Sequence, residues 1–278
     1  MNPIVHLLPE RPRTCPMPPG VGAAVDPHAA VAELLCLMGA PTETLQALPP
    51  LSVSWHRLHA GAALHHEGAA AEAIHFVRAG AFKIFRTAED GYEQVLGFAV
   101  RGEVLGFEAL AHGTHPSSAV ALEEASVYSL PLDEFDSIGQ RLPQLGRLVH
   151  RALSNALLRR GELAEVMAAV AAEVRLARFL LQLSRRMAEC GQSPRRFHLR
   201  MSRRDIASYL GVAHETVSRS FGALSRWGWL HVDNREVEIL DLPGLKHFAQ
   251  NTRRAVDDWP QTQPQTQGPR PELRLCAS

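Results

Sequence analysis

Short apolar runs with glycines between them fill the chain from about residue 51 to about residue 135. Each run has the length of a β-strand, and such runs with turn glycines between them are typical of an antiparallel roll or small barrel. We therefore predict an N-terminal antiparallel β-roll within residues 29–141. Its predicted strands are Ile74–Val77, Ala81–Phe85, Val95–Ala99, Ala119–Leu122 and Ser126–Leu130.

After the predicted roll, apolar residues recur with a period of seven, at Leu142, Val149, Ala156, Leu163 and Val170. A sustained seven-residue repeat lets a helix pack along a partner helix. From Leu142 to Met167 such a helix is about 39 Å long, which is more than a small roll needs. We predict a long dimerisation helix over residues 142–171, with packing on its own domain as the alternative. The predicted dimer contacts are Val149, Ala152, Leu153, Ala156, Leu157, Arg160 and Leu163.

A second helix, Val174–Glu189, is predicted from its apolar face and ends near Gly191, since glycine commonly stops a helix. Beyond it, Ser202 stands three residues before Asp205, a near relative of the capping box that starts helices. The short helix that follows ends at Gly211, which turns the chain without a Cβ penalty.

A further helix is predicted over His214–Trp227, with Val217, Phe221 and Leu224 facing inward. Helix, glycine turn and helix of these lengths indicate a helix-turn-helix. The segments Trp229–Val232 and Glu236–Leu240 then predict two strands joined by a tight Asp-Asn turn. We therefore predict a winged helix-turn-helix over residues 172–250 and an α+β fold for the whole chain.

Composition and charge narrow the function. The 278 residues suit two domains, and 46% apolar with 21% charged residues is a globular profile. Lysine and arginine balance aspartate and glutamate, 29 against 29, so the chain as a whole is not basic. Residues 195–235, however, hold eight arginines against three carboxylates, a net charge of +5. Local positive charge of this kind indicates phosphate binding.

Three polar residues of the second helix of the motif share one face. Glu215, Ser218 and Arg219 are spaced i, i+3 and i+4, opposite the apolar face. Arginine can bond to guanine O6 and N7, glutamate can accept from cytosine N4, and serine can contact a base edge or a methyl. Base recognition is the prediction, and a surface ion pair between Glu215 and Arg219 is the alternative. The full predicted DNA-binding set is Glu215, Ser218, Arg219, His214, Thr216, Arg203 and Arg204.

These residues resemble a known family. The segments Met201–Ala207, Gly211 and His214–Arg219 are similar to the winged helix of the Crp/Fnr transcription regulators, and the Glu-x-x-Ser-Arg pattern resembles the Fnr branch. The resemblance covers residues 50 to 250 and includes upstream segments at Gly91–Gln94, Gly102–Phe107, His115–Ser117 and Ala121–Glu123.

The resemblance implies a function and partners. It implies a homodimer on a two-fold symmetric TTGAT-like site, with Arg219 on the guanine and Glu215 on the opposing cytosine, in control of anaerobic or respiratory genes. It also implies that the loop Thr87–Gln94 contacts RNA polymerase. The predicted polymerase contacts are Glu89, Asp90, Gly91 and Tyr92.

Departures from the family pattern argue against a cofactor. Fnr proteins hold a [4Fe–4S] cluster with three thiolates near the N-terminus and a fourth in the roll. This chain offers Cys15 and Cys36 there, with Tyr128 at the roll position, so four thiolates cannot be assembled. Ligation by Cys15 and Cys36 with other groups stays open. No pair of cysteines has the spacing of a zinc site either, and we predict no metal site.

Two other sensory ligands are disfavoured. Where the cAMP receptor branch holds the nucleotide phosphate, this sequence has Gly106-Phe107 and Ser117-Ser118, without the arginine that a phosphate needs. Haem is an option because several histidines crowd the roll, but structural roles are more common for such residues, and we predict no cofactor. These histidines are His56, His59, His65, His66 and His75.

Two alternatives to a signal-sensing regulator remain. A cupin-like metalloenzyme could use the roll histidines, but neighbours such as His65 and His66 point to opposite faces of a strand, and we predict that the chain is not an enzyme. A regulator controlled by its own abundance is the other. At the dimer seam, Arg160 replaces an acidic residue of Fnr, and it either repels its symmetry mate or pairs with a carboxylate such as Glu162.

The ends of the chain are rich in proline. We predict disordered tails at residues 1–28, which hold seven prolines, and at residues 251–278. No secretory signal and no stretch of membrane-spanning length is evident, so we expect a cytoplasmic protein that does not bind membranes.

Overall fold

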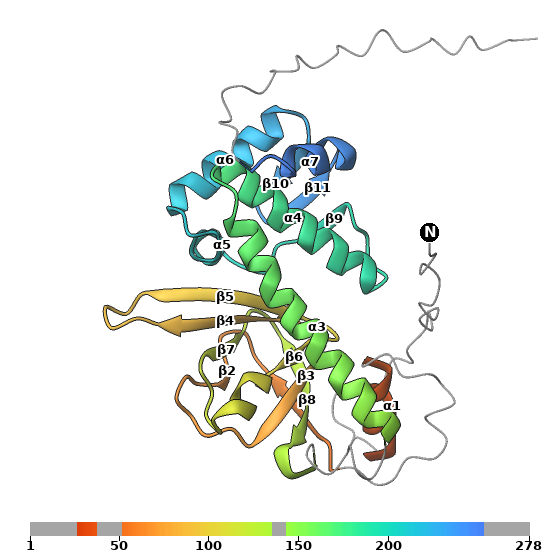
Figure 1. Cartoon of the computed structure of the whole chain (residues 1–278). Helices are drawn as coiled ribbons and strands as arrows, with labels where there is room; N and C mark the ends of the chain where they lie inside the picture. The colour runs from red at the N-terminus through yellow and green to blue at the C-terminus, as the bar shows by residue number, and fades with distance from the viewer. Residues whose placement is uncertain (1–26, 38–51, 135–142, 253–278) are drawn as a thin grey trace, which may run out of the picture.

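The computed structural model describes residues 27–37, 52–134 and 143–252 (Figure 1). Most of both predicted tails, together with Cys15, Cys276 and Leu142, therefore lies outside the described residues. The described chain is α+β: a roll of two antiparallel sheets, a long helix crossing it, and a small helical domain with its own three-stranded sheet.

Two four-stranded antiparallel sheets form the roll. In the first sheet the order is β1 (Ser54–Leu58), β8 (Ala125–Pro131), β3 (Ala73–Ala79) and β6 (Val104–Leu105). In the second the order is β2 (Ala63–His65), β7 (Ser118–Ala121), β4 (Ala81–Thr87) and β5 (Glu93–Val100). A short 3₁₀ helix, η2 (Phe107–Ala111), follows β6.

The five predicted strands are confirmed to within two residues at each end. Strands β1, β2 and β6 were not predicted. β2 and β6 have three and two residues, and β1 has the sequence SWHRL with only Leu58 buried, so none shows a run of apolar residues. Between the sheets lies a core that includes Val77, Phe82 and Val127.

An N-terminal helix, α1 (Pro27–Leu37), covers the first sheet. Its apolar residues Val31 and Leu34 pack with Ile74 and Tyr128 of the roll. Pro27 and His28 fall within the predicted disordered tail, and that prediction is wrong for them. Proline is well suited to the first position of a helix, where its missing N–H costs no hydrogen bond.

The long helix is α3 (Pro143–Met167), and α4 (Ala172–Glu189) follows after a short break. The predicted repeat is therefore wrong at Val170, which lies in the break and is 74% exposed. The backbone there is held by other groups: the Val170 amide donates to the Thr252 carbonyl, and Arg175 Nε donates to the Ala169 carbonyl at 2.8 Å. Since Thr252 is 82 residues away in the chain, the heptad pattern could not show this break.

Four helices and a small sheet form the C-terminal part: α4, α5 (Arg203–Leu210), α6 (His214–Arg226) and α7 (Leu242–Ala249) around β10 (Leu230–Asp233), β11 (Glu236–Ile239) and β9 (Arg196–His198). The sheet order is β10-β11-β9. The strands β10 and β11 confirm the predicted wing, whereas β9 and α7 were not predicted.

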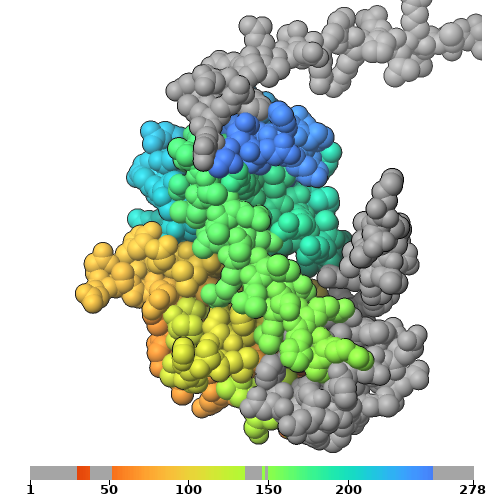
Figure 2. Space-filling model, in the orientation of Figure 1, coloured from red at the N-terminus to blue at the C-terminus, as the bar shows by residue number. Residues whose placement is uncertain are grey.

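One hydrophobic core joins the roll to the C-terminal helices. Phe85, Val95 and Phe98 of the β4–β5 hairpin belong to the same buried cluster as residues of α4, α5, α6 and α7. Phe98 packs against Tyr209 of α5 with ring centroids 5.4 Å apart. In the space-filling view the hairpin extends from the body as a finger beside the C-terminal domain (Figure 2).

Candidate nucleic-acid interface

Helix α5 begins with a reciprocal cap. The Ser202 hydroxyl accepts from the Asp205 amide, and the Asp205 carboxylate accepts from the Ser202 amide at 2.9 Å. The helix ends at Gly211, whose φ of +62° is left-handed. The capping box and the glycine turn were both predicted, and the structure confirms them.

Helix α6 presents opposite faces to the protein and to solvent. Val217, Phe221 and Leu224 are buried against the domain, as predicted. Glu215, Ser218 and Arg219 are all exposed and lie along the outer face. His214 at the start of the helix is also exposed, and Thr216 is half-buried.

Arg219 is held by a neutral neighbour rather than by Glu215. Its guanidinium donates to the Thr216 hydroxyl at 3.1 Å. Among the ion pairs of the described chain, none joins Glu215 to Arg219, so the surface ion pair weighed from the sequence does not form. Glu215 and Arg219 therefore do not neutralise each other, and both are exposed on the outer face.

A cavity of about 330 Å³ lies beside α6, between the start of α5 and the tip of the wing. It is lined by Leu199, Met201, Ser202, Arg203, Arg204, His214, Asn234 and Arg235. Three arginines at one cavity make it suited to an anion such as a DNA phosphate.

Arg203 is fixed in this cavity. Its guanidinium carbon lies 3.6 Å from the centre of the Phe221 ring, and Nη2 donates to the Asn234 carbonyl at 2.8 Å. Burial, and next the neighbouring charge of Arg235, lower the pKa of Arg203 below its usual value. Nη1 is buried and has no hydrogen-bond partner within the described residues.

The wing brings Asn234 and Arg235 to this cavity. Asn234 has a left-handed φ of +52°, which lets β10 turn tightly into β11, as its residue type predicted. The unpredicted β9 pairs with β11 and places Phe197 opposite Val237. β9 has only three residues, and its sequence gives no signal that distinguishes it from a loop.

Comparison with known proteins agrees with this geometry. Residues 174–248 match the family model of the Crp-like helix-turn-helix domain, and residues 55–141 match that of the cyclic nucleotide-binding domain. The transcriptional regulatory protein Btr of Bordetella pertussis is 37% identical over 211 residues, which cover 76% of this chain and 87% of that protein. This chain belongs to the Crp/Fnr family of transcription regulators.

Two further relatives support the assignment. The fumarate and nitrate reduction regulatory protein of Escherichia coli is 35% identical over 193 residues, covering 69% of this chain and 77% of that protein. The structure of FixK2 from Bradyrhizobium japonicum superposes with a TM-score of 0.64 at 27% identity, covering 71% of this chain and 98% of that one. These Crp/Fnr relatives are regulators, which sets aside the cupin-like enzyme.

In this Crp/Fnr chain, most of the predicted dimer residues contact their own subunit. Ala152 and Leu153 pack toward α1 and the first sheet, Ala156 is buried, and Leu163 packs against the C-terminal core. Leu157 is 63% exposed. The side chain of Val149 lies outside the described part of the chain.

Arg160 points at the roll. It forms an ion pair with Glu108 and lies 5.5 Å from the centre of the Phe107 ring. The suggested partner Glu162 is wrong: it faces α4, where its Oε2 lies 3.0 Å from Arg186 Nη2. Two residues along a helix point in widely different directions, so Arg160 and Glu162 cannot share one partner face.

The space between α3 and the roll is filled by charged pairs. Arg159 Nη1 lies 3.0 Å from Glu103 Oε1, and burial raises the pKa of Glu103 although Arg186 and Arg159 oppose the shift. The cavity that remains there measures about 50 Å³. Drug-sized ligands occupy pockets of roughly 300–1,000 Å³. With its arginines already paired and two carboxylates on its wall, this cavity does not fit a nucleoside phosphate.

The roll histidines form one group at least half-buried in the roll and one exposed group. His65 stacks on His115 with centroids 3.8 Å apart, and His75 bonds to Ser129 at 2.8 Å. His56 and His59 lie at the exposed edge. The sequence did not place His115 among the crowded histidines; backbone hydrogen bonds of His115 to Gly68 and Ala69 bring it beside His65. In the described residues, no three His, Cys, Asp or Glu side chains are arranged to hold a metal ion.

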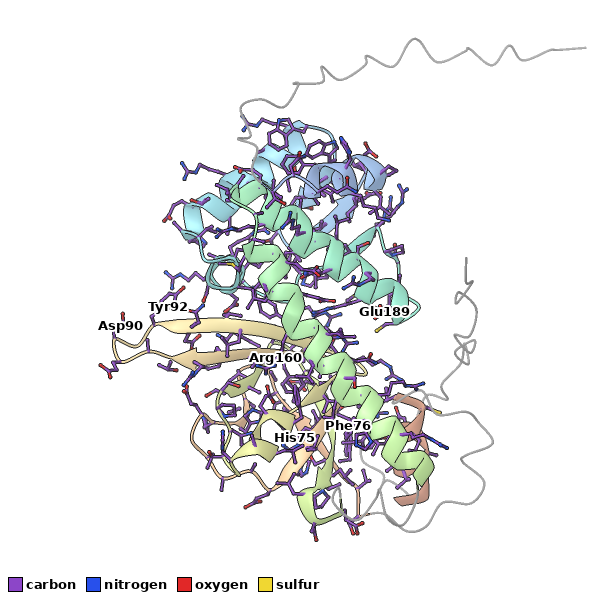
Figure 3. The ribbon with its side chains drawn as sticks, in the orientation of Figure 1. His75, Phe76, Asp90, Tyr92, Arg160 and Glu189 are labelled. Atoms are coloured by element: carbon purple, nitrogen blue, oxygen red, sulfur yellow. The ribbon has the colours of Figure 1, made fainter. Side chains whose placement is uncertain are left out.

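The remaining predicted site is the tip of the β4–β5 hairpin. Glu89, Asp90, Gly91 and Tyr92 are all exposed there, and Figure 3 shows Asp90 and Tyr92 at the end farthest from the body. None of the helices in the described ranges is long and apolar enough to span a membrane.

Proposed function

We propose that this regulator binds a two-fold symmetric, TTGAT-like DNA site as a homodimer and controls anaerobic or respiratory genes. The observation that carries the proposal is the exposed row of Glu215, Ser218 and Arg219 on α6, next to the arginine-lined cavity. The name of the fumarate and nitrate reduction relatives supports the choice of target genes.

Each residue of the interface has a role in the proposal. Arg219 leaves Thr216 and donates two hydrogen bonds to guanine, while Glu215 accepts from the opposing cytosine. Ser218 contacts a neighbouring base edge or methyl group. The residues around them, His214, Thr216, Arg203 and Arg204, bind backbone phosphates and fix the register of the helix on the duplex.

Dimerisation uses α3 in this proposal. Leu157 is exposed together with Leu158 and Gly161 on the side turned away from the roll, and a second α3 would cover them. The other predicted contacts, Val149, Ala152, Leu153, Ala156, Arg160 and Leu163, stay part of the predicted interface, although most of them also contact their own subunit. In this proposal the two recognition helices of the dimer lie about 34 Å apart, one turn of DNA.

The hairpin tip completes the proposal. Glu89, Asp90, Gly91 and Tyr92 extend away from both domains and contact RNA polymerase bound beside the site. The protein acts in the cytoplasm, where the bacterial chromosome lies. No nucleotide effector is part of the proposal, because the cavity between α3 and the roll is filled; control by the abundance of the protein is consistent with this.

Fluorescence anisotropy with a labelled TTGAT-containing duplex tests the proposal. Arg219→Ala should weaken binding by about 1–3 kcal/mol per half-site and relax discrimination at the guanine. Arg226→Ala is the matched control, an exposed arginine at the other end of α6, and should change affinity little. Equal losses by Arg219→Ala on the specific site and on random DNA would contradict base recognition.

A further inference from the structure

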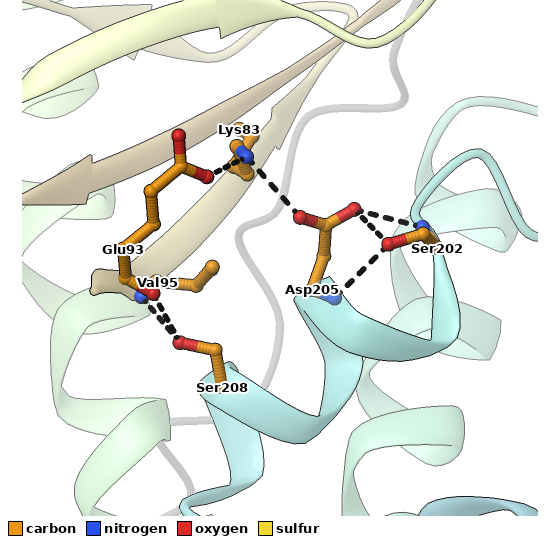
Figure 4. A network of polar contacts seen from close by, with 6 residues as sticks. All are labelled: Lys83, Glu93, Val95, Ser202, Asp205 and Ser208. Atoms are coloured by element: carbon orange, nitrogen blue, oxygen red, sulfur yellow. Dashed lines mark hydrogen bonds and ion pairs between the residues drawn. The ribbon is translucent and has the colours of Figure 1, made fainter. Parts of the chain in front are cut away.

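Helix α5 is joined to the edge of the roll by a serine. The Ser208 hydroxyl donates to the Glu93 carbonyl at 2.7 Å and accepts from the Val95 amide at 2.9 Å (Figure 4). β5 is the last strand of its sheet, so these two backbone groups face away from β4. Ser208 thus takes the place that a neighbouring strand would occupy, and it is buried.

A lysine makes a second polar contact between the β4–β5 hairpin and α5. Lys83 Nζ of β4 lies 2.5 Å from Glu93 Oε2 and 3.2 Å from Asp205 Oδ1. Burial by itself lowers the pKa of Lys83, but the hydrogen bond that Lys83 donates to Glu93 and the interaction with Asp205 outweigh it and raise that pKa. The pair is therefore charged at neutral pH. Both side chains are largely shielded from water, at 13% and 16% exposure, which strengthens their attraction.

Asp205 also holds the start of α5. Its other oxygen, Oδ2, accepts from the Ser202 amide and hydroxyl at 2.9 and 2.6 Å. Lys83 therefore contacts the first turn of α5 through Asp205, while Ser208 contacts β5 from the last turn. Since α5 turns directly into α6 at Gly211, fixing α5 fixes the recognition helix as well.

The roll, which holds α5 through these contacts, is itself attached to α3. The roll is tied to α3 by the Arg159–Glu103 and Arg160–Glu108 ion pairs. Although the helical backbone breaks at residues 168–171, α3 also contacts α4, where Glu162 pairs with Arg186 at 3.0 Å and Gln182 donates to the Glu162 carbonyl. One route from α3 to α6 therefore passes through the roll, β5 and α5, beside a second route through α4. On this route, Lys83 and Ser208 make the polar contacts between the roll and α5.

We propose that Lys83 and Ser208 are positioning residues that set the distance between the two DNA half-sites the dimer accepts. The proposal rests on the proposed function, because it needs a dimer on a two-fold site. The two residues do not touch DNA, so they determine spacing while leaving the reading of each half-site to Glu215, Ser218 and Arg219.

Binding of the full chain to a series of duplexes tests this. The half-sites are moved apart or together in single base pairs, each step shifting one site by about 3.4 Å and rotating it about the duplex. The wild type should lose about tenfold in affinity, equal to about 1.4 kcal/mol, one step from its best spacing. Lys83→Met and Ser208→Ala should reduce that penalty to less than about threefold, with binding to a single half-site unchanged.

Arg86→Met is the matched control. Arg86 lies on β4 like Lys83, but it pairs with Glu67 and is 60% exposed. This variant should keep the wild-type spacing preference, and Lys83→Arg should largely restore it. Thermal unfolding is measured first, and Ser208→Ala carries the test if Lys83→Met does not fold.

The outcomes separate the two proposals. A spacing preference that Lys83→Met and Ser208→Ala leave unchanged overturns the role of these residues, and so does an equal loss on the single half-site. A wild-type protein that binds all duplexes alike overturns the proposed function itself.

Discussion

The half-buried imidazoles of His65 and His75 make stability depend on pH. Burial, and after it the charge of His115, lower the pKa of His65 to about 3 and that of His75 to about 4, so the folded protein holds both in the neutral form. The unfolded chain takes up protons near the ordinary pKa of about 6.5. Stability is therefore full above about pH 6.5 and falls as the pH drops toward 4.

His75→Asn isolates this effect. We expect wild-type unfolding free energy to fall by roughly 2 kcal/mol more than that of the variant between pH 7 and pH 5. Asparagine can keep the hydrogen bond to the Ser129 hydroxyl while losing the titration. Urea unfolding at the two pH values measures the difference, and parallel pH dependences in both proteins would contradict the assignment.

Gly80 is needed for both its backbone conformation and its lack of a side chain. Its φ is +83°, and a Cβ there would lie 2.7 Å from Ala125 Cβ and 2.9 Å from the Glu124 carbonyl oxygen. Gly61 has a φ of +82° and open space around the same position. Gly80→Ala should therefore cost about 1–3 kcal/mol more than Gly61→Ala, because only the first adds a clash to the conformational strain. Equal urea midpoints would show that the backbone shifts freely.

At the scale of the element, the two helices of the helix-turn-helix differ in their caps. Helix α5 starts at Ser202 with a reciprocal cap, whereas α6 starts at Ala213, which has no side-chain hydrogen bond to offer. Ala213→Ser should raise the unfolding free energy by about 0.5–2 kcal/mol, and Ser202→Ala should lower it by a similar amount. Thermal unfolding monitored by circular dichroism gives both values. A decrease for Ala213→Ser would mean that the α6 start is constrained by something other than its cap.

Elements with a local signal were predictable, and contacts between distant segments were not. The capping box, Gly211 and the apolar positions of α6 fix the helix-turn-helix within about 25 residues. The strands β2, β6 and β9 have two or three residues, too few for any period to show. The faces of α3 were missed for another reason: Glu108 lies 52 residues before Arg160, and no local pattern relates them.

The residues of the candidate site also differ in whether the sequence could predict them. Glu215, Ser218 and Arg219 were predictable because helix geometry alone places them on one face. The cavity at Arg203 was not, because it needs Asn234 of the wing and Phe221 of α6 to meet the start of α5.

At the scale of the whole molecule, dimerisation depends on the open side of α3. Leu157 and Leu158 are 63% and 71% exposed, which is unusual for neighbouring leucines on a long helix. Leu157→Glu should shift the protein toward monomer in sedimentation velocity and weaken binding to a two-fold site far more than binding to a single half-site. Glu165→Gln, on the same helix and also exposed, should leave the dimer intact. A Leu157→Glu protein that stays dimeric would place the interface elsewhere.

The hydroxyl of Ser208 on β5 has one further consequence. An open strand at the end of a sheet is a template on which other chains can pair, and proteins protect such edges. Here the protection comes from the DNA-reading domain itself, which covers the backbone of β5 and the apolar side chains of Val95 and Phe98. If the C-terminal domain detached, the edge of β5 would be exposed to neighbouring molecules. The contact between the roll and the C-terminal domain therefore also protects the protein from aggregation through this edge.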